Sequence, residues 1–212
     1  MQGIELARRF YETCGIPMLE EQFPSVLDRI AVGLVGEGSE CLGFDDDISR
    51  DHDFEPGFCL FVTRADYEEF GFALERAYAK LPKTFEGFKR EPLSPVGGNR
   101  HGVLVIEDFY KRFLGASHPP ESPDHWLQIP PSVLRSATSG EVWRDDLGVF
   151  SKIRDTLLAG YPQDVRLKKL GGQVLLMAQA GQYNYARCVS RGERAAAQLA
   201  MGEFVNASLK VI

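Results

Sequence analysis

Two short apolar runs in the first third of the chain enclose a glycine-rich turn and an acidic stretch, and this order limits the available folds. Residues 30–35 (IAVGLV) and 58–62 (FCLFV) have strand length and many branched or aromatic side chains. Gly36, Gly38 and Ser39 end the first run and predict a tight turn. The acidic stretch, residues 45–53 (DDDISRDHD), leads toward the second run. We therefore expect two strands with a strongly charged loop between them.

Asp51 and Asp53 stand two residues apart, ahead of the second apolar run. In an extended segment, residues i and i+2 point to the same side, so both carboxylates share a face and His52 points to the other. Two such charges about 5 Å apart repel by roughly 3 kcal/mol at an effective dielectric constant of about 20. A hard divalent cation, Mg²⁺ or Mn²⁺, removes this repulsion. The pair therefore predicts a metal site with Asp51 and Asp53 as ligands; the alternative is an acidic, solvated loop.

The turn at Gly38 and Ser39 is suited to binding a phosphate, because glycine allows close backbone approach and a following hydroxyl and N–H can hold the anion. Eleven residues separate Ser39 from Asp51. This arrangement resembles the core motif of the DNA polymerase beta-like nucleotidyltransferase superfamily. The resemblance implies that the turn contacts nucleotide phosphates and that Asp51 and Asp53 are catalytic residues that hold one or two magnesium ions.

Two longer strings extend the resemblance. Residues 38–62 (GSECLGFDDDISRDHDFEPGFCLFV) and residues 181–197 (GQYNYARCVSRGERAAA) are similar to a bacterial family of nucleotidyltransferase-like proteins, domain of unknown function 4037. The resemblance covers most of the chain and implies a short or truncated member of that family. It implies no particular acceptor substrate.

The superfamily takes a third carboxylate from a later strand beside the Asp-x-Asp strand, and residues 102–106 (GVLVI) are the candidate strand here. Glu107 and Asp108 follow it and point to opposite faces if the segment is extended. We take Glu107 as the third catalytic acid, with Asp108 as the open alternative. Such an acid would act as general base for the attacking hydroxyl.

Arginine and tyrosine side chains supply further nucleotide-binding candidates. Tyr183, Arg187 and Arg191 share one helical face at four-residue spacing, where the arginines suit a triphosphate and Tyr183 suits a base. The alternative is an inter-domain packing face with salt bridges. Arg50 either meets a phosphate or pairs with the neighbouring acids. Asp45, Asp46 and Asp47 are better explained as a solvated loop or helix cap than as metal ligands.

The cysteine count, the net charge and the length of the apolar runs limit the class of protein. Four cysteines are far apart in the 212 residues, which indicates buried thiols in a reducing compartment rather than disulfides or zinc. A net charge of -6 disfavours a long nucleic-acid partner. No apolar run approaches the roughly 18 residues that span a bilayer. We expect a cytoplasmic protein that does not bind membranes.

The pattern of elements predicts an α+β fold in two domains. Helices are expected over residues 4–14, ended by Gly15 and Pro17, and over residues 23–30 and 66–80, with a loop over residues 83–100. Five prolines in residues 115–132 mark the domain boundary. We predict a nucleotidyltransferase fold over residues 1–128, a small mixed β-sheet flanked by helices. An all-helical domain over residues 129–212 would close the nucleotide cleft, with helices at 145–159, 164–170, 173–187 and 193–209.

These inferences favour a metal-dependent nucleotidyltransferase that moves a nucleotidyl group from a nucleoside triphosphate such as ATP to a hydroxyl on a small molecule, protein or RNA. The alternative is an inactive or weakly active nucleotide sensor or interaction module on the same fold. Transfer of phosphate rather than nucleotide is a third hypothesis. The sequence leaves open the acceptor, the preferred base and the oligomeric state.

Overall fold

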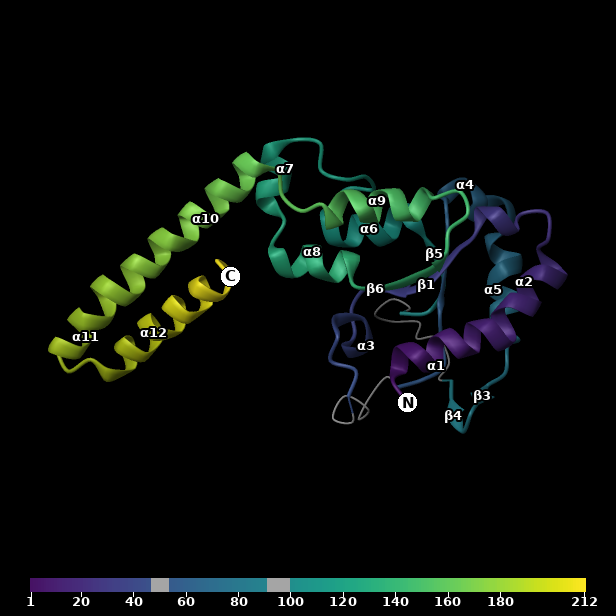
Figure 1. The fold of residues 1–212 in the computed structure, drawn as a ribbon, viewed down its shortest axis with the longest axis horizontal. Helices are drawn as coiled ribbons and strands as arrows, with labels where there is room; N and C mark the ends of the chain where they lie inside the picture. Colours follow the sequence, from purple (N-terminus) through teal and green to yellow (C-terminus); the bar gives the residue numbers. More distant parts are fainter. Residues whose placement is uncertain (47–53, 91–99) are drawn as a thin grey trace. The chain divides into compact units, whose positions relative to one another are not determined.

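The computed structural model describes residues 1–46, 54–90 and 100–212. The chain divides into two compact units (Figure 1): unit 1 is Met1–Pro120 with Ser132–Ala159, and unit 2 is Glu121–Pro131 with Gly160–Ile212. The mixed α and β content expected from the sequence is confirmed. The predicted boundary between residues 128 and 129 falls inside the first segment of unit 2, after which residues 132–159 return to unit 1.

A four-stranded mixed sheet forms the centre of unit 1, with the strand order β5-β2-β1-β6. Strand β1 is antiparallel to both neighbours, and β2 is parallel to β5. Three of these strands match the runs predicted from the sequence, whereas residues 140–144, assigned above to an all-helical domain, form β6. The strands are β1 (Ala31–Val35), β2 (Cys59–Val62), β5 (Gly102–Val105) and β6 (Gly140–Arg144).

The strand register brings three connections to one edge of the sheet, namely the edge that is formed by the ends of the strands. Gly33 of β1 pairs with Cys59 of β2, and Cys59 pairs with Gly102 of β5. Since β1 runs opposite to β2 and β5, the end of β1 lies beside the beginnings of the other two strands. The turn after β1, the segment ahead of β2 and the segment ahead of β5 therefore meet at this edge.

One face of the sheet packs on the N-terminal helices and α5 (Phe72–Ala79). Val32 and Leu60 lie in a buried cluster with Phe10, Phe58 and Tyr78. The helix predicted to end near Gly15 continues instead through α1 (Gly3–Phe10), a π-helical segment (Tyr11–Gly15) and α2 (Ile16–Gln22). Pro17 is accommodated because it falls in the first turn of α2.

The opposite face packs on α6 (Ile106–Leu114) and α9 (Val149–Leu158). The rings of Phe61 and Phe150 stack with centroids 4.1 Å apart, and Phe109 meets Phe61 edge-on at 5.2 Å. The buried Tyr110 hydroxyl donates to the carbonyl of Phe150 at 3.2 Å. Aromatic side chains thus fix both helices against β2.

The remaining elements of unit 1 are short. The helix predicted over residues 23–30 is reduced to a 3₁₀ turn, and the predicted loop over residues 83–100 contains a hairpin. Glu86 and Gly87 both have positive φ in that hairpin, as a two-residue type I′ turn requires. These elements are η2 (Leu27–Arg29), α3 (Ser39–Leu42), α4 (Arg64–Asp66), η4 (Tyr67–Gly71), β3 (Thr84–Phe85), β4 (Phe88–Lys89) and α8 (Pro131–Thr138).

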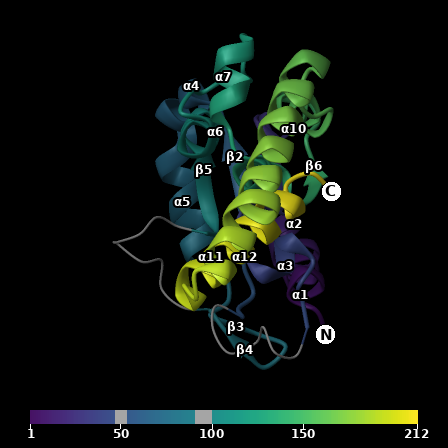
Figure 2. The ribbon, with the colours of Figure 1, turned by 90° about the vertical axis from the view of Figure 1, so that its left-hand side faces the viewer.

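Unit 2 is helical, and its two long helical runs pack side by side (Figure 2). The helices expected at 164–170 and 173–187 are one continuous run, since Gly171 and Gly172 do not interrupt it. Gly181 allows close packing: a Cβ there would lie 2.7 Å from the ring of Phe204. The elements are α7 (Pro123–Gln128), α10 (Gln163–Met177), η5 (Ala178–Tyr185), α11 (Ala186–Ser190) and α12 (Arg194–Leu209).

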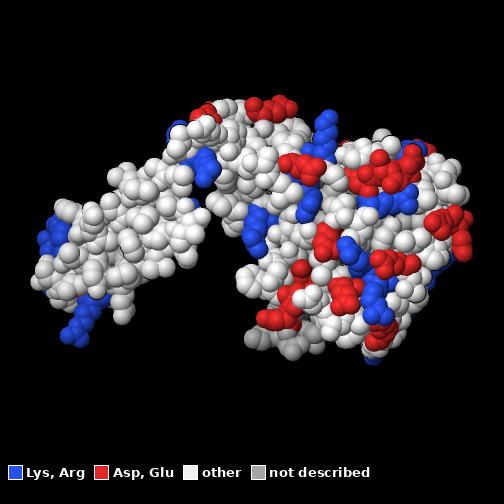
Figure 3. All heavy atoms as spheres, viewed as in Figure 1, with Lys and Arg blue, Asp and Glu red and all other residues white. Residues whose placement is uncertain are grey.

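The surface of unit 2 differs in composition from that of unit 1. Figure 3 shows acidic and basic side chains over much of unit 1 and few over helices α10–α12 on the face toward the viewer. Leu175 and Leu199 are 69% and 74% exposed. None of the helices in the described ranges combines the length and the apolar character that a bilayer-spanning segment needs.

Candidate functional site

The turn after β1 has a backbone conformation that requires glycine. Gly38 has φ 126° and ψ 148°, outside the regions that side-chain-bearing residues adopt. A Cβ on Gly38 would overlap the Arg100 guanidinium and lie 2.8 Å from both carboxylate oxygens of Glu40. Ser39 follows as the first residue of α3, whose last turn is closed by the amide of Leu42 donating to the Gly38 carbonyl at 2.9 Å. The motif selected from the sequence is thus a tight turn at the sheet edge.

A cavity of about 230 Å³ lies at this turn. It contains contributions from each of the three connections that meet at the sheet edge, together with the first residue of α1. Its lining residues are Gly3, Leu34, Glu37, Gly38, Ser39, Glu40, Asp45, Phe54, Glu55, Arg100 and His101. The candidates Gly38 and Ser39 therefore share one cavity with the ends of the segments that lead to and from the Asp-x-Asp sequence.

Asp51, Asp53 and Arg50 lie outside the described residues, as does Asp47. The assignment of Asp51 and Asp53 as metal ligands and of Arg50 as a phosphate contact stays a prediction. Two described residues that flank this stretch in the sequence, Asp45 and Phe54, both line the cavity.

Arg100 is the basic residue of the cavity, and the sequence analysis did not select it. Its guanidinium pairs with the Glu40 carboxylate and donates to the Glu37 carbonyl at 3.3 Å. Its own carbonyl accepts from the thiol of Cys59 at 3.1 Å, which ties the beginning of β5 to β2. A single arginine at the end of a loop carries no sequence signal; only the parallel pairing of β2 and β5 brings it to the Gly38 turn.

The described acids around the cavity have structural partners. The Asp45 carboxylate accepts from the amides of Gly3 at 2.7 Å and Ile4 at 3.0 Å, which caps α1. Glu55 lies 3.3 Å from the buried ring of His101. Within residues 1–46, 54–90 and 100–212, no three His, Cys, Asp or Glu side chains are grouped so as to hold a metal ion. The prediction that Asp45 belongs to a loop or cap rather than a metal site fits this geometry.

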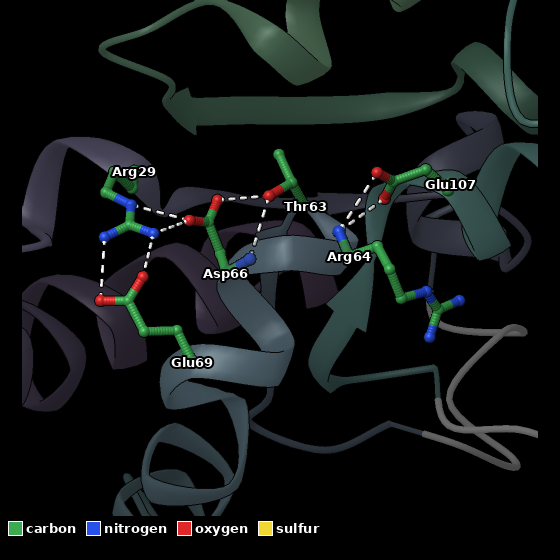
Figure 4. A network of polar contacts seen from close by, with 6 residues as sticks. All are labelled: Arg29, Thr63, Arg64, Asp66, Glu69 and Glu107. Carbon is green, nitrogen blue, oxygen red and sulfur yellow. Dashed lines mark hydrogen bonds and ion pairs between the residues drawn. The ribbon is translucent and has the colours of Figure 1, made fainter.

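Glu107 and Asp108 lie in the first turn of α6, beyond the end of β5, rather than in an extended strand. Both carboxylate oxygens of Glu107 accept from the amide of Arg64, at 3.1 and 3.0 Å, so Glu107 caps the first turn of α4 (Figure 4). Asp108 pairs with the Arg64 guanidinium at 2.5 Å. Neither acid lines the Gly38 cavity. The structure thus does not bring Glu107 together with Gly38 and Ser39.

The same far end of the sheet carries a second set of polar contacts, also shown in Figure 4. The Thr63 hydroxyl donates to Asp66 at 2.6 Å and accepts from the Asp66 amide at 3.2 Å. Asp66, which is 7% exposed, also accepts from Nε of Arg29 at 2.7 Å. Arg29 reaches Glu69 as well, and these two acids raise the pKa of its guanidinium. This network joins η2 to the first turn of α4.

Tyr183, Arg187 and Arg191 belong to the long helical run of unit 2. Arg187 donates to the Tyr183 hydroxyl and lies over the Tyr183 ring at 4.7 Å from its centroid. Tyr183 is 57% exposed. Arg191 is the C-cap residue that follows the last residue of α11, Ser190. The spacing therefore pairs two of the three residues with each other, and their role toward a nucleotide stays a prediction.

Two cysteines are buried beside the Gly38 turn. Cys41 lies in α3 and Cys59 begins β2. Burial raises the pKa of both thiols, in the case of Cys59 to about 12. At neutral pH both remain protonated packing groups, as the sequence analysis expected, whereas Cys14 and Cys188 are only partly buried.

Comparison with known proteins identifies similarity in one part of the chain. The model of a family described as "Domain of unknown function (DUF4037)" matches residues 126–212. This supports the domain of unknown function that the sequence analysis named, over the C-terminal part of the chain. Neither the curated proteins nor the solved structures give a match.

Proposed function

We propose that the protein is a nucleotidyltransferase whose nucleoside triphosphate binds at the Gly38 cavity. The observation that supports this most is the convergence at one sheet edge of three segments: the Gly38–Ser39 turn, residues 54–58, which follow Asp51 and Asp53 in the sequence, and the beginning of β5 with Arg100. A glycine at φ 126° lets the backbone approach a ligand closely. Oxygen, amide and guanidinium groups then surround a space of about 230 Å³.

Among the described residues no group of three His, Cys, Asp or Glu side chains could hold a metal ion, so we assign the metal to Asp51 and Asp53. Mg²⁺ takes oxygen ligands and often keeps one or two carboxylates together with substrate phosphates. The nearest described acids, Glu37 and Glu40, are engaged by Arg112 and Arg100. When bound, the ion would neutralise charge that develops on the phosphates.

The residues of the turn would act by positioning. The Ser39 hydroxyl lines the cavity and would orient the triphosphate. Arg100 is 31% exposed and would exchange Glu40 for a phosphate oxygen, since guanidinium groups bind both anions in the same geometry. Glu107 is not required in this proposal because its carboxylate is occupied by the Arg64 amide.

The test is pyrophosphate release from a panel of nucleoside triphosphates with Mg²⁺, comparing Asp53→Asn with the natural chain. We expect Asp53→Asn to lower turnover by at least about 100-fold, the loss typical of removing one charge-stabilising group. Asp46→Asn is the matched control, because Asp46 belongs to the same acidic stretch and is exposed. Equal turnover by Asp53→Asn and the natural chain would remove the proposal.

One observation favours a second candidate, a nucleotide sensor without turnover. No carboxylate from β5 or α6 lines the Gly38 cavity. A missing third acid would leave the attacking hydroxyl without a general base. Calorimetry with the same triphosphates, with and without Mg²⁺, separates the two: binding without pyrophosphate release indicates the sensor.

A further inference from the structure

A second cavity in unit 1 adjoins the Gly38 cavity and is unused by the proposed nucleotide site. It has a volume of about 360 Å³ and lies between β5 and α6. Glu37 and Arg100 line both cavities, so the two spaces meet at the turn after β1. All of its lining residues belong to unit 1. The cavity is therefore a feature of one compact unit.

The walls of this cavity are mainly apolar and aromatic. Leu104 of β5 and Val35 of β1 contribute from the sheet, and Phe109 and Phe113 contribute from α6. Phe109 and Phe113 lie edge-to-face with centroids 5.2 Å apart. A volume of this size with apolar walls and a few polar groups is typical of sites for small organic molecules. Flat aromatic walls favour a ligand with a flat apolar body.

Three arginines, Arg64, Arg100 and Arg112, line the cavity, against two acids, Glu37 and Asp108. Arg112 pairs with Glu37 and Arg64 pairs with Asp108. The side chains of both pairs are about half exposed, between 47% and 59%, so each pair contributes little to the stability of the fold. A ligand anion that offers two oxygens to a guanidinium can replace such a carboxylate. Arg100 is already paired with Glu40, so the preference for one anionic group rests on exchange at Arg64 or Arg112.

We infer that this cavity binds the acceptor of the transfer reaction, a small hydroxylated molecule with an aromatic or flat apolar body and one anionic group. The acceptor role rests on the proposed function, whereas the ligand class rests on the cavity alone. With the acceptor held here, its hydroxyl oxygen would bond to the α-phosphorus of the triphosphate. The bond from that phosphorus to the oxygen bridging the β-phosphate would break, releasing pyrophosphate, and the hydroxyl proton would pass to solvent.

The ligand class is tested on the full chain by calorimetry with three probes that share one body: 1-naphthyl phosphate, 1-naphthol and 1-naphthylmethylammonium. We expect the phosphate to bind at least about tenfold more tightly than the naphthol, and the ammonium to bind weakest. Arg112→Gln and Arg64→Gln should remove the preference for the phosphate. Arg76→Gln, an arginine of α5 outside the cavity, is the matched control and should preserve it. Equal affinity for the three probes, or a preference that survives both cavity variants, would overturn the inference.

A second titration tests the acceptor role with the non-hydrolysable analogue adenosine 5′-(β,γ-imido)triphosphate and Mg²⁺. We expect the analogue and 1-naphthyl phosphate to bind together, each with its affinity changed by less than about threefold. Displacement of the probe by the analogue would place the cavity inside the nucleotide site and overturn the acceptor role. If the probe binds and no nucleotide does, the proposed function fails and the acceptor role fails with it, while the ligand class stands.

Discussion

The two ends of strand β2 are both rich in charged side chains, yet they differ in what those charges contact. At the end of β2, Asp66 and Glu107 accept hydrogen bonds from Arg29, Thr63 and the Arg64 amide. At the beginning of β2, a glycine with positive φ turns the chain beside a cavity, and Arg100 faces into it. The contacts of Asp66 and Glu107 hold elements together, whereas the Gly38 turn borders the cavity proposed for the nucleotide.

The difference shows that an acid cluster cannot be assigned from its charge alone. Glu107 was a candidate catalytic acid in the sequence and Asp45 a candidate cap, and the carboxylate of each accepts two hydrogen bonds from backbone amides at the first turn of a helix. Those amides have no partner within the helix, so a carboxylate there is stabilising. A carboxylate that already accepts two such hydrogen bonds has fewer lone pairs left for a metal ion.

The largest expected change in stability is at the end of β2. Asp66→Ala removes a nearly buried acceptor and leaves Arg29 and Thr63 without it, so we expect the free energy of unfolding to fall by about 3 kcal/mol. Nucleotide affinity should stay unchanged. Urea denaturation measures the free energy of unfolding, and calorimetry measures the nucleotide affinity. Glu69→Ala is the control, since Glu69 binds the same arginine but is 58% exposed, and should cost below about 1 kcal/mol.

The next effect is at the Gly38 turn. Gly38→Ala places a methyl group in the space of Arg100 and Glu40, at a strained φ. We therefore expect the free energy of unfolding to fall by about 2 kcal/mol and nucleotide binding to be lost. Gly43→Ala is a matched control, because Gly43 also has positive φ, 86°, but has open space around its Cβ position. The free energy of unfolding of Gly43→Ala should fall by about 1 kcal/mol, and this variant should still bind the nucleotide. If Gly38→Ala still binds the nucleotide, the Gly38 turn is not the binding site, and the functional difference between the two ends of β2 is contradicted.

A smaller effect is expected at Glu107. Glu107→Gln weakens the cap on α4, so the free energy of unfolding should fall by about 1 kcal/mol while pyrophosphate release per folded molecule stays within about twofold. A fall in turnover of 100-fold or more would instead return Glu107 to the role of third catalytic acid predicted from the sequence.

The smallest effect is on pH dependence and comes from Cys59 at the beginning of β2. The pKa of its buried thiol is about 12, above the roughly 8.5 expected in the unfolded chain. Because the folded-state pKa is raised, the stabilisation is complete below the unfolded-state pKa and is lost progressively as the pH rises from that value to the folded-state pKa of about 12. Between pH 8 and pH 9 this thiol should lower the free energy of unfolding by less than about 1 kcal/mol. The decrease should shrink in Cys59→Ala, measured by urea denaturation; an unchanged pH dependence would contradict burial of this thiol.

Local patterns were sufficient to predict several elements. The runs at residues 30–35, 58–62 and 102–106 form strands because branched and aromatic residues between turn signals favour extended structure. The helix expected over residues 66–80 is present as α4, η4 and α5. Strand β6 was missed because its five residues are held mainly by pairing with β1 and by the stacking of Trp143 on Tyr11.

The amino-acid sequence by itself determined the α+β content, the glycine turn at Gly38 and the acidic connection toward β2, because these depend on backbone propensity and on charge along the chain. Only the tertiary structure decided that Arg100 reaches the turn, that Glu107 caps α4 and that residues 140–144 complete the sheet. Each of these depends on which segments pair across tens of residues, and neither spacing nor composition specifies that register.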